Sequence, residues 1–156
     1  MSSEEREMEN KELRELYFDV LTEIDGLTEV ELGESNDICF NYGGSDYYWL
    51  YADEKDTKII ELCFHCSSRF KDNDEKIKAV HLCNQINKKF KTVKMFIDDE
   101  AGDITARADL FVTGILPAGN GFSFNDKERF VEDLLLALSA IEEATDYFFD
   151  EMGWRG

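Results

Sequence analysis

The feature that most constrains the fold of this chain is a five-residue run, Tyr47-Tyr48-Trp49-Leu50-Tyr51, that is apolar on both faces of a β-strand. Side chains alternate across a strand, so Tyr47, Trp49 and Tyr51 point one way while Tyr48 and Leu50 point the other. One face can pack on the protein's own helices. The other face then meets a partner, a second subunit or a long helix, and the run therefore favours a binding function over a catalytic one.

Periodic apolar residues predict the elements on either side of this strand. A helical spacing extends from about residue 10 to residue 24 and stops at Gly26, while residues 1–9 are expected to form a frayed acidic extension. Alternation with a period of two predicts four strands, over residues 30–32, 38–42, 47–51 and 59–66. The connections between them are too short for parallel crossovers, so we expect an antiparallel meander.

The second half of the chain predicts two more helices and a hairpin. A helix is expected over about residues 74–90, a hairpin from strands at residues 93–97 and 104–112, and a last helix over residues 125–152. The predicted order, α-β-β-β-β-α-β-β-α, is typical of an α+β fold in which helices cover an antiparallel sheet. No linker divides the 156 residues, which predicts a single domain over residues 1–156 with a core of its own.

The charge of the chain limits its partners. Its 35 Asp and Glu residues outnumber its 17 Lys and Arg residues, which gives a formal net charge of -18. Such a field repels phosphate backbones and anionic lipid surfaces, so we expect neither nucleic-acid nor membrane binding. The acidic start lacks the order of a signal peptide, no apolar stretch approaches the ~20 residues of a membrane span, and the cysteines are too sparse for a disulfide scaffold. These features predict a cytoplasmic protein that needs no cofactor.

Two cysteine-containing stretches invite a zinc interpretation that geometry disfavours. Cys63 and Cys66 precede His81 and Cys83, and all four are common zinc ligands. In a regular strand, however, the odd separation of Cys63 and Cys66 sends their side chains to opposite faces, and His81 and Cys83 lie about 200° apart on a helix. We therefore expect buried or half-buried thiols and no metal site.

An enzyme built on Cys63 and His65 is the other chemical alternative. Both residues share a strand face with Glu61, which outlines a Cys, His, Glu arrangement. Neighbours on one strand face lie about 7 Å apart at the backbone, a spacing that seldom gives the aligned hydrogen bonds of a catalytic triad. The chain also lacks a phosphate-binding glycine loop, a nucleophile elbow and a metalloprotease helix motif. We therefore expect a non-enzymatic protein.

Four stretches of the chain resemble the bacterial YbjN-domain family of sensory transduction regulators. They are Ile38–Gly43, the aromatic run with the polar residues 53–56, Asn84–Phe90, and Val93–Asp98 with its return strand. The resemblance implies an α+β domain with a fold like that of type III secretion chaperones, often dimeric, with a role in regulation or protein interaction and no assigned catalytic residues. Asn84 and Asn87 match the family's paired asparagines, which either bond a neighbouring backbone group or bind a ligand.

These observations predict a non-enzymatic protein-binding or regulatory domain, assembled as a homodimer, that uses an aromatic sheet face. Aromatic side chains are enriched in interaction cores. The predicted partner-binding residues are Tyr47, Trp49, Tyr51 and Phe96, with Cys39 and Cys63 nearby. Two alternatives stay open: the face lies beneath the chain's own N-terminal or C-terminal helix, or the protein is a secretion-type chaperone that holds an extended client segment.

Overall fold

A computed structural model describes residues 14–34, 37–43, 46–52, 59–98, 102–112 and 124–154 of the chain. Residues 14–22 form a helix, which we call the N-terminal helix. The elements that follow are β1 (Leu27–Leu32), β2 (Asp37–Tyr42), β3 (Asp46–Ala52), β4 (Ile59–Cys66), α2 (Asn73–Lys89), β5 (Lys94–Ile97), β6 (Ile104–Phe111) and α3 (Phe124–Met152). The predicted α+β class and element order are confirmed. The extension expected at residues 1–9 lies outside the described residues.

One antiparallel sheet contains the six strands in the order β1-β2-β3-β4-β6-β5. β1 to β4 form the expected meander, because each strand pairs with the next in the antiparallel sense. β6 rather than β5 joins this meander, and its pairing with β4 runs from Ile59–Phe111 to Cys66–Ile104. β5, with four residues, pairs with β6 and forms one edge of the sheet among the described strands.

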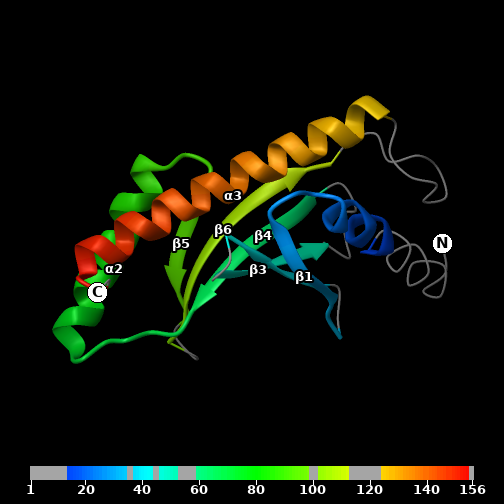
Figure 1. Cartoon of the computed structure of the whole chain (residues 1–156). Coiled ribbons are helices and arrows are strands. Elements are labelled where there is room, and N and C mark those ends of the chain that lie inside the picture. Colours follow the sequence, from blue (N-terminus) through cyan, green and yellow to red (C-terminus); the bar gives the residue numbers. More distant parts are fainter. Residues whose placement is uncertain are drawn as a thin grey trace, which may run out of the picture.

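The helices pack on one face of this sheet, which we call the covered face (Figure 1). α3 runs along the sheet against β4 and β6, and α2 lies beside β5 and α3. Ile38, Leu50, Leu62 and Ala108 form one row of the covered face across four strands, and all of them are buried. Removal of this row and of the facing helix residues from water drives folding. None of the described helices combines the length and the hydropathy that crossing a bilayer requires.

Local capping explains where α2 begins. The Asp72 carboxylate accepts a hydrogen bond of 2.9 Å from the Glu75 backbone N–H, as expected of an N-cap. Acidic residues follow in the first turn and Lys88 and Lys89 stand in the last, an arrangement that the helix dipole favours at both ends. The buried residues of α2 are Ala79, Leu82, Cys83 and Ile86, which belong to the stripe that the helical spacing predicts.

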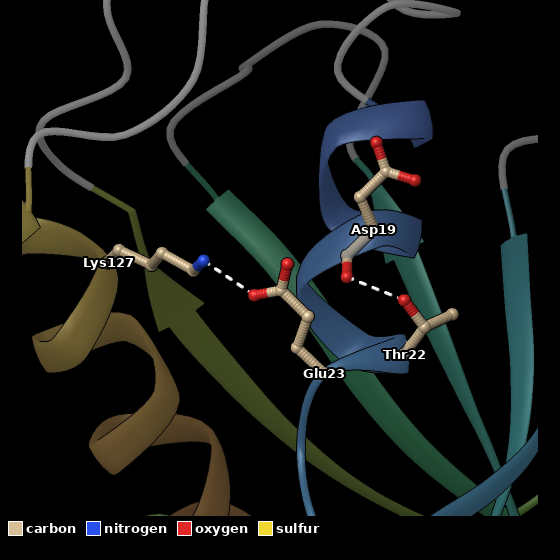
Figure 2. A network of polar contacts seen from close by, with 4 residues as sticks. All are labelled: Asp19, Thr22, Glu23 and Lys127. Atoms are coloured by element: carbon tan, nitrogen blue, oxygen red, sulfur yellow. Dashed lines mark hydrogen bonds and ion pairs between the residues drawn. The ribbon is translucent and has the colours of Figure 1, made fainter.

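The N-terminal helix is joined to the start of α3 by an ion pair and a ring contact. Figure 2 shows the ion pair between Lys127 and Glu23, in which Nζ lies 2.6 Å from Oε2. The rings of Tyr17 and Phe130 are 5.6 Å apart between centroids. In the same view the Thr22 hydroxyl donates to the Asp19 carbonyl at 2.7 Å and so satisfies a group of the last helical turn. These contacts connect the described beginning of the chain to an element more than a hundred residues later.

The residues after α3 fasten its C-terminal end to the region where α2 begins. Trp154 Nε1–H donates to Glu75 Oε1 at 2.9 Å, and an Arg69 guanidinium nitrogen donates to the Trp154 carbonyl at 3.3 Å. The indole also packs on the rings of Phe70 and Phe148, with centroids 5.5 and 5.7 Å away. This contact set, which we call the C-terminal clasp, holds two helices that the sequence separates by a hairpin of the sheet.

Candidate functional site

Opposite the helices lies a second sheet face, which we call the open face. Cys39, Trp49, Cys63 and Arg107 form one row of it, because they are register partners across β2, β3, β4 and β6. The hydrophobic core of the described residues joins the three helices to the covered face and includes none of these four side chains. Within the described part of the chain, the open face therefore has no helix packed on it.

The structure places all four predicted partner-binding residues on the open face. Tyr47 and Tyr51 alternate with the buried Tyr48 and Leu50 in β3, and Phe96 reaches the same face because its register partner in β6 is Thr105, the partner of His65. Tyr47 is 44% and Phe96 42% exposed, whereas Trp49 and Tyr51 are half-buried by their neighbours in the sheet. The predicted division of the aromatic run between core and outer face is confirmed for Tyr48 and Leu50, which are each 1% exposed.

His65 holds the aromatic rings of the open face in place. Its Nε2 lies 3.2 Å from the Tyr51 hydroxyl and its Nδ1 lies 2.9 Å from Thr105 Oγ1. The Trp49 ring packs on the imidazole with a centroid distance of 5.2 Å. Burial lowers the pKa of His65 below its ordinary value of 6.5, against a smaller opposing effect of the Asp103 charge. The imidazole therefore bridges two hydroxyl groups beside Trp49.

The thiols of the open face are poorly suited to nucleophilic chemistry. Burial, with a smaller effect of the Glu61 charge, raises the pKa of Cys63 to about 12, and burial raises the pKa of Cys39 as well. Both nitrogens of His65 are engaged by Tyr51 and Thr105, so neither is bonded to a thiol. The Cys, His, Glu arrangement that the strand face outlines is therefore not assembled as a catalytic set.

The cysteines considered as zinc ligands point to different faces of the sheet. Cys63 is the register partner of Arg107 on the open face, whereas Cys66 is the partner of the buried Ile104 on the covered face. Cys83 is buried on α2 and His81 is exposed. Among the residues that the structure describes, no three His, Cys, Asp or Glu side chains are grouped as metal ligands.

Asn87 is a structural residue of the covered side. Its side-chain oxygen accepts a hydrogen bond of 2.7 Å from the Met95 backbone N–H, and its Nδ2 donates to the Met95 carbonyl at 3.0 Å. Asn87 thus ties α2 to the edge strand β5, which is the backbone role that its position predicts. Asn84 is exposed on α2, and its predicted role as a polar family position stays a prediction.

Sequence reasoning placed Glu61 on this strand face but missed the other carboxylates that border the aromatic rings. Asp37 and Glu61 are the two register partners of Tyr51, and Asp109 is the next residue along that row. Arg107 lies between Glu61 and Asp109, at 3.9 and 3.3 Å from their carboxylates. The alternation within each strand indicates which face of the sheet a carboxylate occupies. Which carboxylates lie next to each other depends on the order of the strands, and alternation does not determine that order.

A hollow lies between the end of β6 and the first turns of α3, and Asp109 of the open-face border belongs to its lining. Its volume is about 350 Å³, and a smaller hollow of about 220 Å³ shares Asp109, Leu110 and Asp133 with it. The larger hollow is lined by Asp109, Leu110, Phe111, Val112, Asp126, Arg129, Phe130 and Asp133. The aromatic residues that line these hollows are Phe111 and Phe130, whereas the open face brings together Tyr47, Trp49, Tyr51 and Phe96, so the open face is the stronger candidate for a binding surface.

Three solved structures share this fold at low sequence identity. YbjN from E. coli, described as "a putative transcription regulator", matches with a TM-score of 0.61 at 15% identity over 84% of this chain and 86% of its own. An uncharacterized protein from Methanothermobacter thermautotrophicus matches with a TM-score of 0.57 at 13% identity over 90% of this chain and 99% of its own. A chain of the HopA1-SchA chaperone-effector complex matches with a TM-score of 0.57 at 12% identity over 92% of this chain and 97% of its own.

Sequence comparison gives a family. No curated protein sequence matches the chain. The profile of the YbjN family, described as "Putative bacterial sensory transduction regulator", matches residues 19–120. Because this match spans more than half of the 156 residues, the chain belongs to the YbjN family.

Proposed function

We propose that this protein is a non-enzymatic, protein-binding regulator and that the open face is its binding surface. One observation carries the proposal: an aromatic sheet face centred on Trp49, on which none of the described helices packs. Aromatic residues are enriched at the cores of interfaces, and Trp and Tyr often dominate the energy of binding. The description of the family as regulators agrees with a binding role.

The rings of the open face are arranged to bind at low entropic cost. His65 fixes Tyr51 by a hydrogen bond and Trp49 by ring packing, and the Arg107 guanidinium lies 6.0 Å from the centroid of Phe96. Side chains that are already ordered lose little conformational freedom when a partner docks. This arrangement supports a preformed surface over one that orders on binding.

Replacement of Trp49 tests the proposal. Trp49 lies on the open face, so W49A should abolish association. Its side chain is only half-buried, so the protein should stay folded. Leu136→Ser, on the exposed side of α3 at 70% exposure, is the matched control and should leave association intact. Affinity purification from the native host measures association, and thermal unfolding measures the fold. A W49A protein that keeps its partners would contradict the proposal, as would one that loses ~3 to 5 kcal/mol of stability as a core site does.

The W49A variant also tests the homodimer that the family resemblance implies. Light scattering gives the subunit count of the wild-type chain, and W49A then reports whether the open face holds the two copies together. A dimer that persists in W49A would place self-association elsewhere on the molecule.

A secretion-type chaperone is the second candidate function. The observation that favours it is the fold shared with a chain of the HopA1-SchA chaperone-effector complex over 92% of this protein. A likeness at this identity supports the fold and leaves the activity to be tested. The chaperone hypothesis expects capture of one stoichiometric client whose bound segment is extended and resists protease only in the complex. A partner that is folded when free would contradict it.

A Cys/His-dependent enzyme is the alternative with the least support. The raised pKa of Cys63 and the two hydroxyl partners of His65 leave no activated nucleophile among the open-face residues described here. An activity that disappears in Cys63→Ala would reverse this conclusion.

A further inference from the structure

The charged residues that border the open face indicate what kind of partner fits it. Five carboxylates belong to this border in the described chain: Glu29, Glu31, Asp37, Glu61 and Asp109. The described part of the face supplies two cations, Arg107 and Lys94, which are register partners in β6 and β5. The face is therefore negative as well as aromatic.

The carboxylates belong to strand positions next to those of the rings. Tyr51 has Asp37 as its register partner on one side and Glu61 on the other, and Glu61 in turn is paired with Asp109. A bulge in β1, where Glu29 has a φ of 51°, lets the Tyr47 hydroxyl donate a hydrogen bond to the Glu29 carboxylate. Like charges on neighbouring strands oppose folding, so a cation from a partner would relieve a cost that the free protein bears.

The protein's own cations compensate only part of this charge. Arg107 divides one guanidinium between Glu61 and Asp109, at 3.9 and 3.3 Å. In the described part of the chain, no ion pair reaches Glu31 or Asp37 on the other side of the aromatic rings. In the described chain, negative charge that no ion pair compensates therefore lies beside the aromatic rings on the β1 and β2 side of the open face.

Aromatic rings edged by carboxylates match the chemistry of arginine and lysine side chains. A guanidinium stacks on the face of a Trp or Tyr ring, and its planar donors pair with carboxylates. Resting on the function proposed above, we propose that the partner docked on the open face is a basic protein segment whose arginine or lysine side chains lie over Trp49 and Tyr51 and pair with Asp37, Glu61 and Glu31.

A second copy of the chain fits this face less well. It would bring the same border of carboxylates and a formal charge of -18 to the contact. Juxtaposed like charges penalise association, whereas opposite charges speed and orient it. Nucleic acid is disfavoured by the same sign of charge. A basic protein segment is the occupant whose charge complements the face.

The titration of neighbouring groups is consistent with a negative potential over the face. Burial raises the pKa of Cys39, and the charges of Glu31, Asp37 and Glu29 raise it further. Burial raises the pKa of Tyr51 to about 12, with smaller effects from Asp37 and Glu61 among its neighbours. The carboxylates thus act on groups at the centre of the face as well as at its border.

The chain contains a built-in control for locating a basic ligand. It has two tryptophans, Trp49 on the open face and Trp154 in the C-terminal clasp. The probe is a decapeptide of alternating arginine and serine, titrated into the full ¹⁵N-labelled chain while the two indole N–H resonances are followed. The arginine peptide should shift the Trp49 resonance and leave that of Trp154 in place. A peptide with glutamate in place of arginine should shift neither.

Charge-neutralising variants separate a specific face from the general field of an acidic protein. D37N with E61Q removes two carboxylates beside Tyr51, and E132Q with E143Q removes two exposed carboxylates of α3. We expect the first pair to weaken binding of the arginine peptide by about tenfold or more and the second pair by less than about twofold. Circular dichroism and thermal unfolding of the wild type and of both double variants establish that each is folded.

The outcomes distinguish this inference from the proposed function. Equal weakening by both pairs, or a Trp49 resonance that does not move, would overturn the basic partner. If W49A abolishes native association while D37N with E61Q does not affect it, the face binds protein by other means and only this inference fails. If a wild-type dimer dissociates in W49A, the occupant is a second copy and the inference also fails.

Discussion

At the scale of single residues, Asn87 has a role that its exposed position on α2 conceals. One amide side chain satisfies both the N–H and the carbonyl of the buried Met95 in the edge strand. A buried backbone group that loses its partner costs more than an average hydrogen bond contributes. Among the described strands, β5 has no neighbouring strand on its outer side. Asn87 therefore makes the two hydrogen bonds to Met95 that such a strand would make.

Asn87→Ala should lower the free energy of unfolding by about 1 to 3 kcal/mol, since two backbone groups of Met95 lose their partner. Asn84→Ala is the matched control one helical turn earlier, and its exposed side chain should matter by less than ~0.5 kcal/mol. Urea unfolding of both variants measures the difference. Equal effects would show that Asn87 acts only through helix propensity.

His65 should make stability depend on pH. Its pKa is lowered by burial, so the native state binds the proton less well than the unfolded chain. The stability contribution is therefore fully present above the ordinary pKa of 6.5 and is lost as pH falls through the lower folded value. His65→Gln should flatten the decline of the unfolding free energy below pH 6.5, which urea unfolding at a series of pH values measures. A decline of the same slope in His65→Gln would assign it to other groups.

At the scale of elements, the C-terminal clasp links α3 to α2 through a few side chains. The clasp combines packing of Trp154 on Phe70 and Phe148 with the hydrogen bond to Glu75. The two contributions are separable, because phenylalanine preserves a ring and removes the indole donor.

Trp154→Ala should destabilise the protein by roughly 2 to 3 kcal/mol, below the range for a fully buried tryptophan because the ring is half-buried. Trp154→Phe should cost about 1 kcal/mol, mainly the hydrogen bond to Glu75. Hydrogen exchange should locate the loss of protection in the first turns of α2 and the last turns of α3. Loss spread evenly over the sheet would contradict a local clasp.

The helices and strands could be predicted from local patterns in the sequence. Which strands lie next to each other in the sheet could not. Alternation assigns Tyr48 and Leu50 to one face of β3 and Trp49 to the other, whatever strand lies beside it. The insertion of β6 between β4 and β5 depends on long-range pairing, and the same alternation fits either order. The border of carboxylates was missed for that reason, because Asp109 becomes a neighbour of Glu61 only through β6.

At the scale of the whole molecule, an excess of negative charge works against the compact state. A formal charge of -18 on 156 residues produces self-repulsion that dissolved salt screens. Raising ionic strength from 0.01 to 0.15 M shortens the Debye length from about 30 to about 8 Å. We therefore expect the free energy of unfolding of this protein to rise over this range of ionic strength. The free energy of unfolding of a protein with balanced surface charges should change little over the same range.

Thermal unfolding should show this gain as a rise in Tm of about 2 to 4 °C, the equivalent of ~1 kcal/mol for a chain of this size. Reversal of two exposed charges on α3, E132K with E143K, should raise Tm at low salt and reduce the further rise on adding salt. A Tm that falls with salt in the wild-type protein would mean that specific ion pairs, such as Lys127 with Glu23, outweigh the general repulsion.

The two faces of the sheet also divide each strand into two sets of positions with different structural constraints. In β3, Tyr48 and Leu50 belong to the core under the helices, whereas Tyr47, Trp49 and Tyr51 lie outside that core, on the open face. Exchange of the second set changes no contact in the core. Under the function proposed above, proteins that share this fold at 12% to 15% identity can differ in binding preference through this face while they keep the same core. Transplanting the outward residues between them should carry the preference along.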